Sequence, residues 1–348
     1  MHQTCSAQTG LLLVLLFKQM SLKNLRAAGR KVGKKLSHHI ATSLKNYKIP
    51  ELAERYPDWV KAGMMASARS TPRACSFLLG MAEGAEQSFK NIFCLWYEEL
   101  WFADTADKAK LKDTGCTDII VRDGSRTIIG HTNDEGKGDG SELVQIIASG
   151  FPDVYMIFTR GCPSIGLNSA GIVISGNQVD AKDTRPGVPR MLLYVEALWS
   201  RSIREAEKIL LCEQRASSFN NILANAKGDI VSLEASAKHS VKVFHDNGAS
   251  AHTNHFIFLP EMEARKGASL DGSRDRLERA FKEIDAAGAH VSVKDIALML
   301  ATHGKGGLCR HGDNSSHTVF SVVFLPTERA FIYGKGNPCS GDFIIYRY

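Results

Sequence analysis

The stretch that decides the fold is residues 115–134, which read GCTDIIVRDGSRTIIGHTND. Two apolar, β-branched runs, 118–122 and 126–131, flank the Asp-Gly turn signal between them, so a β-hairpin is predicted here. Cys116 would stand at the very start of the first strand. Asp134 follows the second strand closely and would lie near the same end of the sheet.

The bond between Gly115 and Cys116 is a candidate for self-cleavage. Gly115 has no Cβ, so its backbone can adopt strained geometry and leave its carbonyl open to the neighbouring thiol. An N-to-S acyl shift followed by hydrolysis would leave Cys116 with a thiol and a free α-amine, whose pKa of roughly 8 suits a general base. One residue would then supply nucleophile and base. For an isolated Gly-Cys-Thr, a buried structural cysteine is the commoner case, so the rest of the chain must decide.

Length and composition indicate a soluble globular protein. The 348 residues can bury a large core as one domain or two, and the 44% hydrophobic and 23% charged content is ordinary for that class. Much of the net charge of +6 comes from residues 18–45, which contain no acid. Because no aromatic residues interleave with these charges, a solvated helical face is favoured over nucleic-acid or membrane contact.

The eight cysteines lie at positions 5, 75, 94, 116, 162, 212, 309 and 339. None forms a Cys-x-x-Cys pair, so the sequence predicts no zinc site. The wide spacing does not resemble a disulfide scaffold, so a reducing, cytoplasmic compartment is expected. The apolar run 11–17 is too short to span a bilayer. It also makes a poor signal peptide, with a targeting segment as the alternative.

The chain changes character near the proposed cut. Apolar spacing near 3.6 predicts amphipathic helices around 50–65 and 78–96, so residues 1–115 are assigned to a helical N-terminal segment. The polar, lysine-rich stretch 104–113 predicts an exposed linker leading into the cut. Residues 116–348 are assigned to a catalytic domain of mixed structure.

Strands and helices are both predicted in the catalytic domain. Strands are expected at 154–158, 172–177, 221–224, 230–233, 318–324 and 330–333, and 161–171 is expected to be rich in turns. Helices are expected after Pro189, after Ser202, from Arg274 to Ala287 and after Ser292. Ser202 with Glu205 forms a capping-box pattern. Strands that flank a helical block predict an α+β architecture of two sheets covered by helices.

Several motifs, taken in order, resemble the isopenicillin N acyltransferase family of N-terminal-nucleophile hydrolases, and more distantly the choloylglycine hydrolases. The motifs are GMAEGAE at 80–86, GCT at 115–117, GHTND at 130–134, GLNSAG at 166–171, GVP at 187–189 and HTNHF at 252–256. Each is weak alone, but their joint order and spacing, from about Tyr56 to the C-terminus, make a strong signal.

The resemblance implies a four-layer αββα sandwich and a precursor that cuts itself between Gly115 and Cys116. The helical α chain and the catalytic β chain would stay associated. Cys116 would be the nucleophile, and Asp134 would hydrogen-bond the new α-amine. Asn254 would donate to the developing oxyanion, which contributes roughly 3–4 kcal/mol in other enzymes, and Asn177 matches a second oxyanion-side asparagine. From the residues alone, a turn aspartate and a loop asparagine remain the alternatives.

Arg276 matches the family's arginine on a late helix. Arg274 and Arg279 have acidic residues four positions away on the predicted helix, whereas Arg276 has none, so its guanidinium is expected to reach a more distant partner. The chain also departs from the family. Penicillin-making members have a tryptophan just before the aspartate, but here Asn133 stands there. Residues 131–132 are instead similar to an insect β-alanyl-amine hydrolase branch, which puts a β-lactam substrate in doubt.

Two glycine-rich stretches, 137–140 and 304–307, do not fit a phosphate loop. They are interpreted as flexible turns or as lids over the pocket. The neighbouring Cys-Arg-His at 309–311 would be either a substrate contact or a surface turn.

The sequence therefore predicts a self-processed cysteine amidohydrolase or acyltransferase. Cys116 would attack the carbonyl of a small N-acyl compound, and the thioester would pass to water or to an amine, with an acyl-CoA as a candidate second substrate. This chemistry needs no metal or cofactor. The alternative is a non-catalytic scaffold that binds a ligand or partner. The joint presence of Cys116, Asp134 and Asn254 argues against it, because a decayed site would have lost one of them.

Overall fold

The computed structural model describes residues 3–103, 114–136, 139–312 and 316–348, with side chains from residue 22 onward. The predicted linker at 104–113 lies outside the described residues. Among the described helices, none is long and apolar enough to cross a bilayer.

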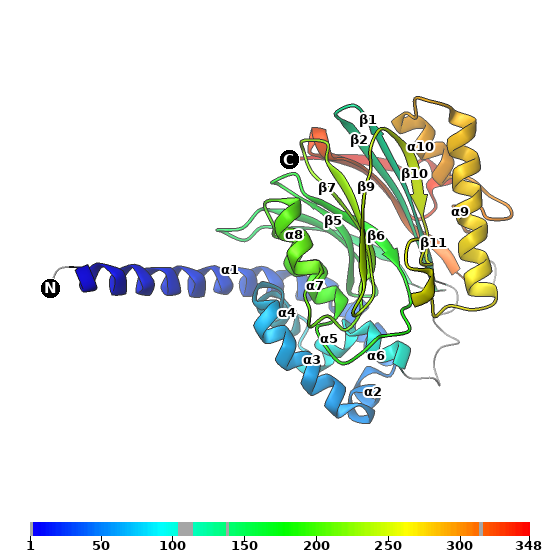
Figure 1. Cartoon of the computed structure of the whole chain (residues 1–348). Helices are drawn as coiled ribbons and strands as arrows, with labels where there is room; N and C mark the ends of the chain where they lie inside the picture. The colour runs from blue at the N-terminus through cyan, green and yellow to red at the C-terminus, as the bar shows by residue number, and fades with distance from the viewer. Residues whose placement is uncertain (1–2, 104–113, 137–138, 313–315) are drawn as a thin grey trace.

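Two antiparallel sheets form the centre of the molecule (Figure 1). The six-stranded sheet has the order β10-β1-β2-β11-β12-β13, and the seven-stranded sheet runs in sequence order from β3 to β9. The first sheet comprises β1 (Gly115–Asp123), β2 (Arg126–Gly136), β10 (Gly248–His252), β11 (Ser316–Leu325), β12 (Ala330–Lys335) and β13 (Phe343–Arg347). The second comprises β3 (Ser141–Ile146), β4 (Val154–Thr159), β5 (Cys162–Asn168), β6 (Val173–Gln178), β7 (Phe219–Ala224), β8 (Ile230–Ala235) and β9 (Ser240–Phe244).

Helices cover the outer face of each sheet, which gives the four-layer αββα sandwich that the resemblance implies (Figure 1). The six-stranded sheet is covered by α9 (Ala268–Ala287) and α10 (Val293–Leu300), and the seven-stranded sheet by α7 (Arg190–Leu198) and α8 (Ile203–Leu210). Three apolar cores separate the four layers. Ile129, Leu167, Ile222 and Phe320 belong to the core between the sheets, and the other two cores lie under the helices.

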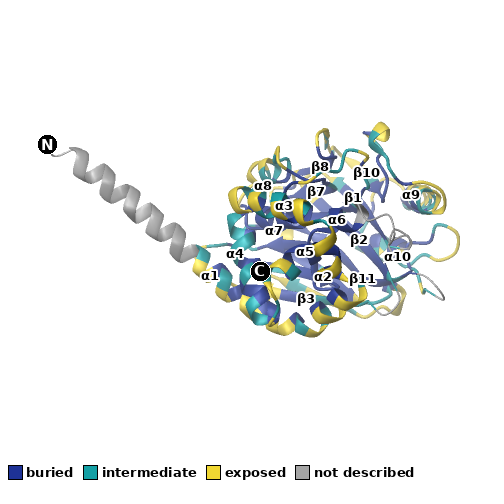
Figure 2. Cartoon of the chain, turned by 90° about the horizontal axis from the view of Figure 1, so that it is seen from below, coloured by how far each residue is buried: buried dark blue, intermediate teal, exposed yellow. Residues whose placement is uncertain are grey.

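Six further helices precede the sheets. They are α1 (Gln3–Asn46), α2 (Ile49–Arg55), α3 (Pro57–Ser70), α4 (Pro72–Gly84), α5 (Phe89–Leu95) and α6 (Glu98–Ala103). Their buried side chains share one apolar core with α7 and the seven-stranded sheet, in which Trp96 and Trp199 are among the largest buried side chains. Figure 2 shows the strands largely buried and the exposed residues gathered on the outer faces of the helices.

Helices α1 and α4 approach each other more closely than larger side chains would allow. Gly29 and Gly33 on α1, and Gly80 and Gly84 on α4, each face the backbone of the other helix. A Cβ added at any of them would lie 2.0–2.1 Å from a carbonyl oxygen. Between the two glycines of α4, Glu83 pairs with two arginines of α1. The GMAEGAE motif therefore joins the first helix to the rest of the helical layer.

Gly80→Ala is expected to destabilise the protein by about 1–3 kcal/mol, because its Cβ cannot fit without separating the two helices. Gly272 in α9 is the matched control, since a Cβ there would meet nothing within 4 Å. Gly272→Ala is expected to be neutral or to stabilise by about 0.5–1 kcal/mol, because alanine loses less backbone entropy in a helix. Denaturant unfolding measures both, and equal stability of the two variants would contradict the close packing.

The hairpin predicted at residues 115–134 is confirmed. β1 and β2 are joined through Gly124, which has φ 59°, and Gly115 is paired directly with Asp134. β10 lies on the other side of β1 and pairs His252 with Asp118. This pairing brings the HTNHF motif to the end of β1 at which Cys116 lies.

The turn-rich interpretation of residues 161–171 is wrong for most of that stretch. β5 occupies residues 162–168 and pairs with β4 and β6. Its glycine content reflects close packing, since a Cβ at Gly166 would lie 2.6 Å from the Tyr155 carbonyl oxygen and 2.8 Å from Leu198. The late helix also begins earlier than predicted, at Ala268 instead of Arg274.

Candidate active site

Cys116 lies near the start of β1, where its thiol is buried beside β6. Two side-chain N–H donors converge on its sulfur. Asn254 Nδ2 lies 3.0 Å from Sγ and Asn177 Nδ2 lies 3.4 Å from it. The backbone N–H of Gln178 acts with them to lower the pKa of the thiol. The fold therefore brings both sequence-predicted asparagines to Cys116.

Asn254 and Arg276 also hold the backbone of the cysteine. The Asn254 Oδ1 atom accepts from the backbone N–H of Cys116 at 2.9 Å and from Arg276 Nη2 at 2.7 Å. Arg276 Nη1 donates to the Cys116 carbonyl oxygen at 2.7 Å and to Thr117 Oγ1 at 3.1 Å. The guanidinium thus reaches the cysteine across 160 residues of sequence, as its lack of a helical partner indicated. The partner expected for the neighbouring Arg279 is wrong, because Arg279 pairs with Glu283.

Gly115 is required for space and not for an unusual backbone conformation. It lies within β1 and does not have a positive φ. A Cβ at this position would lie 2.8 Å from Arg276 Nη2 and 3.3 Å from Asn254 Oδ1. The sequence-based expectation of a strained glycine is therefore replaced by a steric reason, the close approach of Arg276.

Asp134 is buried opposite Gly115. Its Oδ1 atom accepts from Thr318 Oγ1 at 2.7 Å. Its Oδ2 atom lies 3.9 Å from Arg310 Nη1 and has no hydrogen-bond partner among the described residues. Burial raises the pKa of the carboxyl, although Arg276, Arg310 and Thr318 act in the opposite direction. A buried carboxylate oxygen that accepts no hydrogen bond can take another donor, and this one lies on the residue paired with Gly115.

The electrostatic environment keeps the thiol neutral. Burial and the nearby Asp118 carboxylate raise the pKa of Cys116, against the three N–H donors. Burial lowers the pKa of Arg276 to about 10, while Asp134 and Cys116 oppose this shift. At neutral pH the intact chain therefore holds a protonated thiol beside a cationic guanidinium.

This pKa shift predicts how the intact chain reacts with iodoacetamide. Because the pKa of Cys116 is raised, a smaller fraction is thiolate at any given pH than in an ordinary cysteine, whose pKa is roughly 8.5. The alkylation rate is expected to keep rising with pH above that value. The tryptic peptide 113–122, which retains the Gly115–Cys116 bond, reports only uncut chains. An alkylation rate that stops rising at a pH equal to or below the ordinary thiol pKa would contradict a raised pKa of Cys116.

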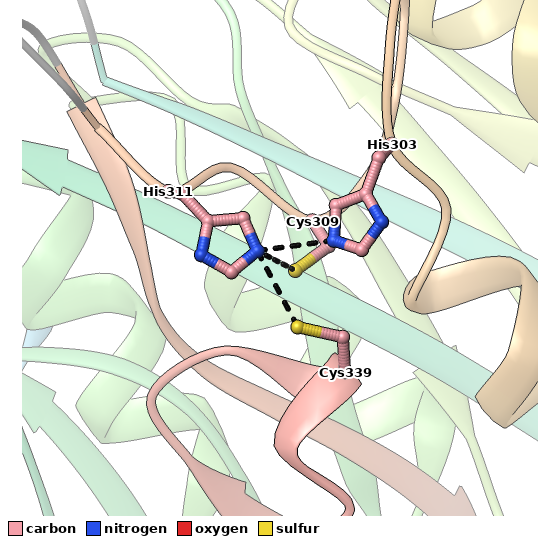
Figure 3. Close-up of side chains that lie close together, drawn as sticks. All are labelled: His303, Cys309, His311 and Cys339. Atoms are coloured by element: carbon pink, nitrogen blue, oxygen red, sulfur yellow. Dashed lines mark hydrogen bonds between the residues drawn. The ribbon is translucent and has the colours of Figure 1, made fainter.

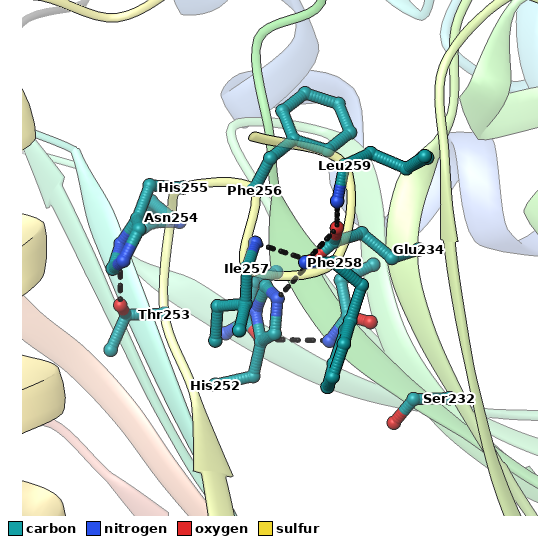
Figure 4. Close-up of polar contacts among 12 residues, drawn as sticks. Ser232, Glu234, His252, Thr253, Asn254, His255, Phe256, Ile257, Phe258 and Leu259 are labelled. Atoms are coloured by element: carbon teal, nitrogen blue, oxygen red, sulfur yellow. Dashed lines mark hydrogen bonds and ion pairs between the residues drawn. The ribbon is translucent and has the colours of Figure 1, made fainter. Parts of the chain in front are cut away.

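The asparagines are held by a buried carboxylate that the sequence analysis did not identify (Figure 4). Glu234 on β8 accepts from the three consecutive backbone N–H groups of residues 257–259 at 2.7–2.8 Å. It also lies 2.9 Å from His252 Nε2, and His252 Nδ1 lies 3.0 Å from Asn177 Oδ1. One side chain therefore fixes the segment that carries Asn254 and, through an imidazole, the orientation of Asn177.

The charge of Glu234 is stabilised by these contacts. Burial alone would raise the pKa of its carboxyl, but His252 and the backbone N–H groups outweigh burial and lower it. The sequence places this acidic residue near the end of the apolar strand 230–235, at a buried position where an apolar core side chain would be expected. Such a residue needs buried partners, but the sequence does not say which ones.

Cys116 lines a cavity of about 60 Å³ together with Asp134 and Asn254. A larger cavity of about 1120 Å³ is lined by Arg276 and the loop that follows α10. Thr114, two residues before the cysteine, lines both. The larger volume is sufficient for a small-molecule substrate.

Comparisons with known proteins identify the family of the chain. A family model described as acyl-coenzyme A:6-aminopenicillanic acid acyl-transferase matches residues 121–338, more than half of the chain. The match begins five residues after Cys116 and spans Asp134, Asn177, Asn254 and Arg276, but not Gly115. Two matching solved structures are variants of a conjugated bile acid hydrolase from Clostridium perfringens. Each has 11% identity and a TM-score of 0.43, and covers 67% of this chain and 97% of its own. No curated protein matches the chain.

Proposed function

The chain belongs to the acyl-coenzyme A:6-aminopenicillanic acid acyl-transferase family, and we propose that it is a self-processed cysteine enzyme acting on a small N-acyl amide. It would cleave or transfer the acyl group through a thioester on Cys116. The observation that carries this proposal is the convergence of the Asn254 and Asn177 side-chain N–H donors on the Cys116 sulfur, next to a Gly-Cys bond. The family resemblance read from the motifs is confirmed by the family match.

The first step would be cleavage of the chain by its own thiol. The Cys116 sulfur attacks the carbonyl carbon of Gly115, the C–N bond breaks, and the thiol proton passes to the departing nitrogen. Water then hydrolyses the thioester and leaves a carboxylate on Gly115 and a free α-amine on Cys116. Two contacts support this step. Asn254 Oδ1 already holds the nitrogen that departs, and Arg276 holds the Cys116 carbonyl.

The new α-amine would replace the amide N–H beside Asn254. Asp134 lies opposite Gly115, and its Oδ2 atom, which accepts no hydrogen bond from the described residues, supports a role in holding this amine. An amine titrating near neutral pH can take the proton of the thiol, which overcomes the raised pKa of the thiol in the uncut chain. The cut would thereby convert a neutral thiol into an activated nucleophile.

Acyl transfer would use the same donors. The thiolate attacks the substrate carbonyl, and the oxyanion develops next to Asn254 Nδ2, with Asn177 as the second donor. The α-ammonium then protonates the leaving amine, and the acyl group remains on Cys116 as a thioester. Water is the default acceptor, and an amine or thiol substrate bound in the larger cavity would give transfer instead.

The two chains would stay associated after the cut, because buried ionic contacts join them. Glu98 on α6 pairs with Arg160 and with Arg190, and the neighbouring Glu99 accepts from the Arg190 backbone N–H at 2.9 Å. The apolar core that α1–α6 share with the seven-stranded sheet reinforces these contacts. Separation would leave buried charges without partners, which is strongly unfavourable.

Glu234→Gln is expected to slow self-cleavage on the order of tenfold to a hundredfold, because it loses a charged acceptor that serves four donors. The side chain acts through Asn254 and Asn177, so on a substrate the fall should appear in kcat more than in KM. Glu261→Gln is the matched control, since Glu261 is an exposed residue in the segment after residue 259. Cleavage at the wild-type rate in both variants would show that this carboxylate does not position the site.

The proposal is tested by trapping the acyl-enzyme. The processed protein is mixed with a panel of N-acyl amino acids and N-acyl amines, quenched in acid, and the mass of its β chain is measured. An acyl-sized increase located on Cys116 by peptide mapping supports the proposal, and Cys212→Ser should give the same adduct. Binding of panel members without adduct or turnover, even at substrate saturation, would favour the non-catalytic scaffold.

A further inference from the structure

Four side chains away from Cys116 converge on one point near the surface: His303, Cys309, His311 and Cys339 (Figure 3). The first three belong to the loop between α10 and β11. Cys339 belongs to the short helix η3 (Pro338–Ser340). One nitrogen or sulfur atom of each residue lies within 4.8 Å of the corresponding atom of every other.

Hydrogen bonding alone does not explain this cluster. His311 Nε2 lies 3.0 Å from His303 Nε2, 3.4 Å from Cys339 Sγ and 3.7 Å from Cys309 Sγ. An imidazole nitrogen carries either one hydrogen or one lone pair, so it cannot bond to all three neighbours. In a tetrahedral zinc site, bonds of about 2.0–2.3 Å place the ligand atoms roughly 3.3–3.8 Å from one another. Two of the three separations fall within that range, and the His303–His311 separation would have to open slightly.

We propose that these four residues bind a structural Zn²⁺ ion. Two thiolates and two imidazoles form the Cys₂His₂ set of structural zinc sites, and tetrahedral sulfur–nitrogen ligation selects Zn²⁺ over Ca²⁺ or Mg²⁺. Four protein ligands complete the coordination and leave no position for water or substrate. The ion would therefore hold the structure and would not take part in acyl chemistry, so the inference is independent of the proposed function.

The loop is shaped to present its ligands together. Gly304, Gly306 and Gly312 have φ angles of 85°, 66° and 65°, a conformation that favours glycine. Asn337, two residues before Cys339, donates its Nδ2 to Cys309 Sγ at 3.4 Å and to the Arg310 carbonyl at 2.7 Å. Residues around a metal site commonly orient its ligands through hydrogen bonds of this kind.

The proposed ion would fix one wall of the larger cavity. Eight of the ten residues 303–312 line that cavity, and Arg310 stands between two of the ligands in the sequence. The Arg310 backbone N–H donates to Thr318 Oγ1 at 2.9 Å, and the same hydroxyl donates to Asp134 at 2.7 Å. Binding of the ion would thus hold the loop against the residues around Asp134.

The sequence contains no Cys-x-x-Cys pair, and for that reason no zinc site was predicted from it. The four ligands proposed here have a different spacing. The ligand pattern is His-x5-Cys-x-His-x27-Cys, so the fourth ligand is distant in sequence. Pairing of β11 with β12 brings η3 back to the loop. Residues 309–311, interpreted from the sequence as a substrate contact or a surface turn, would then carry two of the ligands, and all three also line the larger cavity.

Metal analysis of the full chain tests the proposal. Protein produced in zinc-supplemented medium and freed of loose metal should retain about one equivalent of zinc per chain. Cys339→Ser and His303→Ala should each lower zinc affinity at least tenfold. Cys212→Ser and His290→Ala are the matched controls, a cysteine and an exposed histidine outside the cluster, and should retain the metal. Circular dichroism checks that each variant is folded.

Cobalt exchange keeps the test decisive if a ligand variant fails to fold. Wild-type protein loaded with Co²⁺ should show thiolate-to-metal absorption and the intense bands of tetrahedral cobalt. Wild-type protein that retains no zinc and shows no such cobalt spectrum would overturn the proposal. A disulfide between Cys309 and Cys339 in the freshly purified protein, or zinc retained fully by the folded Cys339→Ser variant, would also overturn it.

Discussion

Cys116→Ala is expected to remain a single chain of 348 residues and to cleave no amide. Without the sulfur there is no atom to attack the Gly115 carbonyl, and without the cut there is no α-amine to act as base. Removal of a catalytic nucleophile lowers turnover on the order of a millionfold in other enzymes. Both reactions are therefore expected to fall below detection, as followed by denaturing mass spectrometry and by product release.

Cys212→Ala is the matched control, because Cys212 is half-buried and lies outside the site. It is expected to be cut and to be active at the wild-type rate. Cys116→Ser is informative in addition, since a hydroxyl can still process slowly. A Cys116→Ala variant that is cut at the same bond, or that turns over substrate normally, would eliminate Cys116 as the nucleophile.

Asn254→Ala is expected to lower the rate on the order of a hundredfold to a thousandfold, the cost of one lost oxyanion donor. The variant also removes the acceptor for the Cys116 N–H and for Arg276 Nη2. Part of the loss would therefore come from displacement of the cysteine and the arginine.

Asn254→Asp separates the two effects. Aspartate keeps an oxygen for the Cys116 N–H and for Arg276, but it lacks the Nδ2 donor that lies 3.0 Å from Sγ. A loss equal to that in Asn254→Ala assigns the effect to the donor. Asn247→Ala, at an exposed asparagine outside the site, should be unaffected. If Asn254→Asp retains wild-type activity, Asn254 does not stabilise the oxyanion.

The sequence predicted the parts of the site that are local. A β-hairpin with an Asp-Gly turn has a defined register, so Asp134 could be expected at the end of the sheet where Cys116 begins. The charge pattern of the late helix also indicated that Arg276 has a distant partner, because helical spacing is a local property. The αββα architecture followed from the order of the predicted elements and the resemblance.

Contacts between distant segments could not be predicted in this way. The hydrogen bonds from the backbone of residues 257–259 to Glu234 depend on how a loop folds over a strand. The Cys₂His₂ cluster depends on the pairing of β11 with β12, which brings η3 next to the loop after α10. Composition also misled at 161–171, where Gly166 is needed for close packing of a strand and only Gly161 and Gly171, at its two ends, lie in turns. Each of these features is set by packing in three dimensions, which sequence spacing does not encode.

The central claim is that Cys116 becomes an N-terminal nucleophile, and the intact mass of the purified protein under denaturing conditions tests it most directly. Two fragments are predicted, one ending at Gly115 and one beginning at Cys116, and they should be absent in Cys116→Ala. A single uncut wild-type chain that persists on long incubation, or fragments that meet at another bond, would contradict the claim.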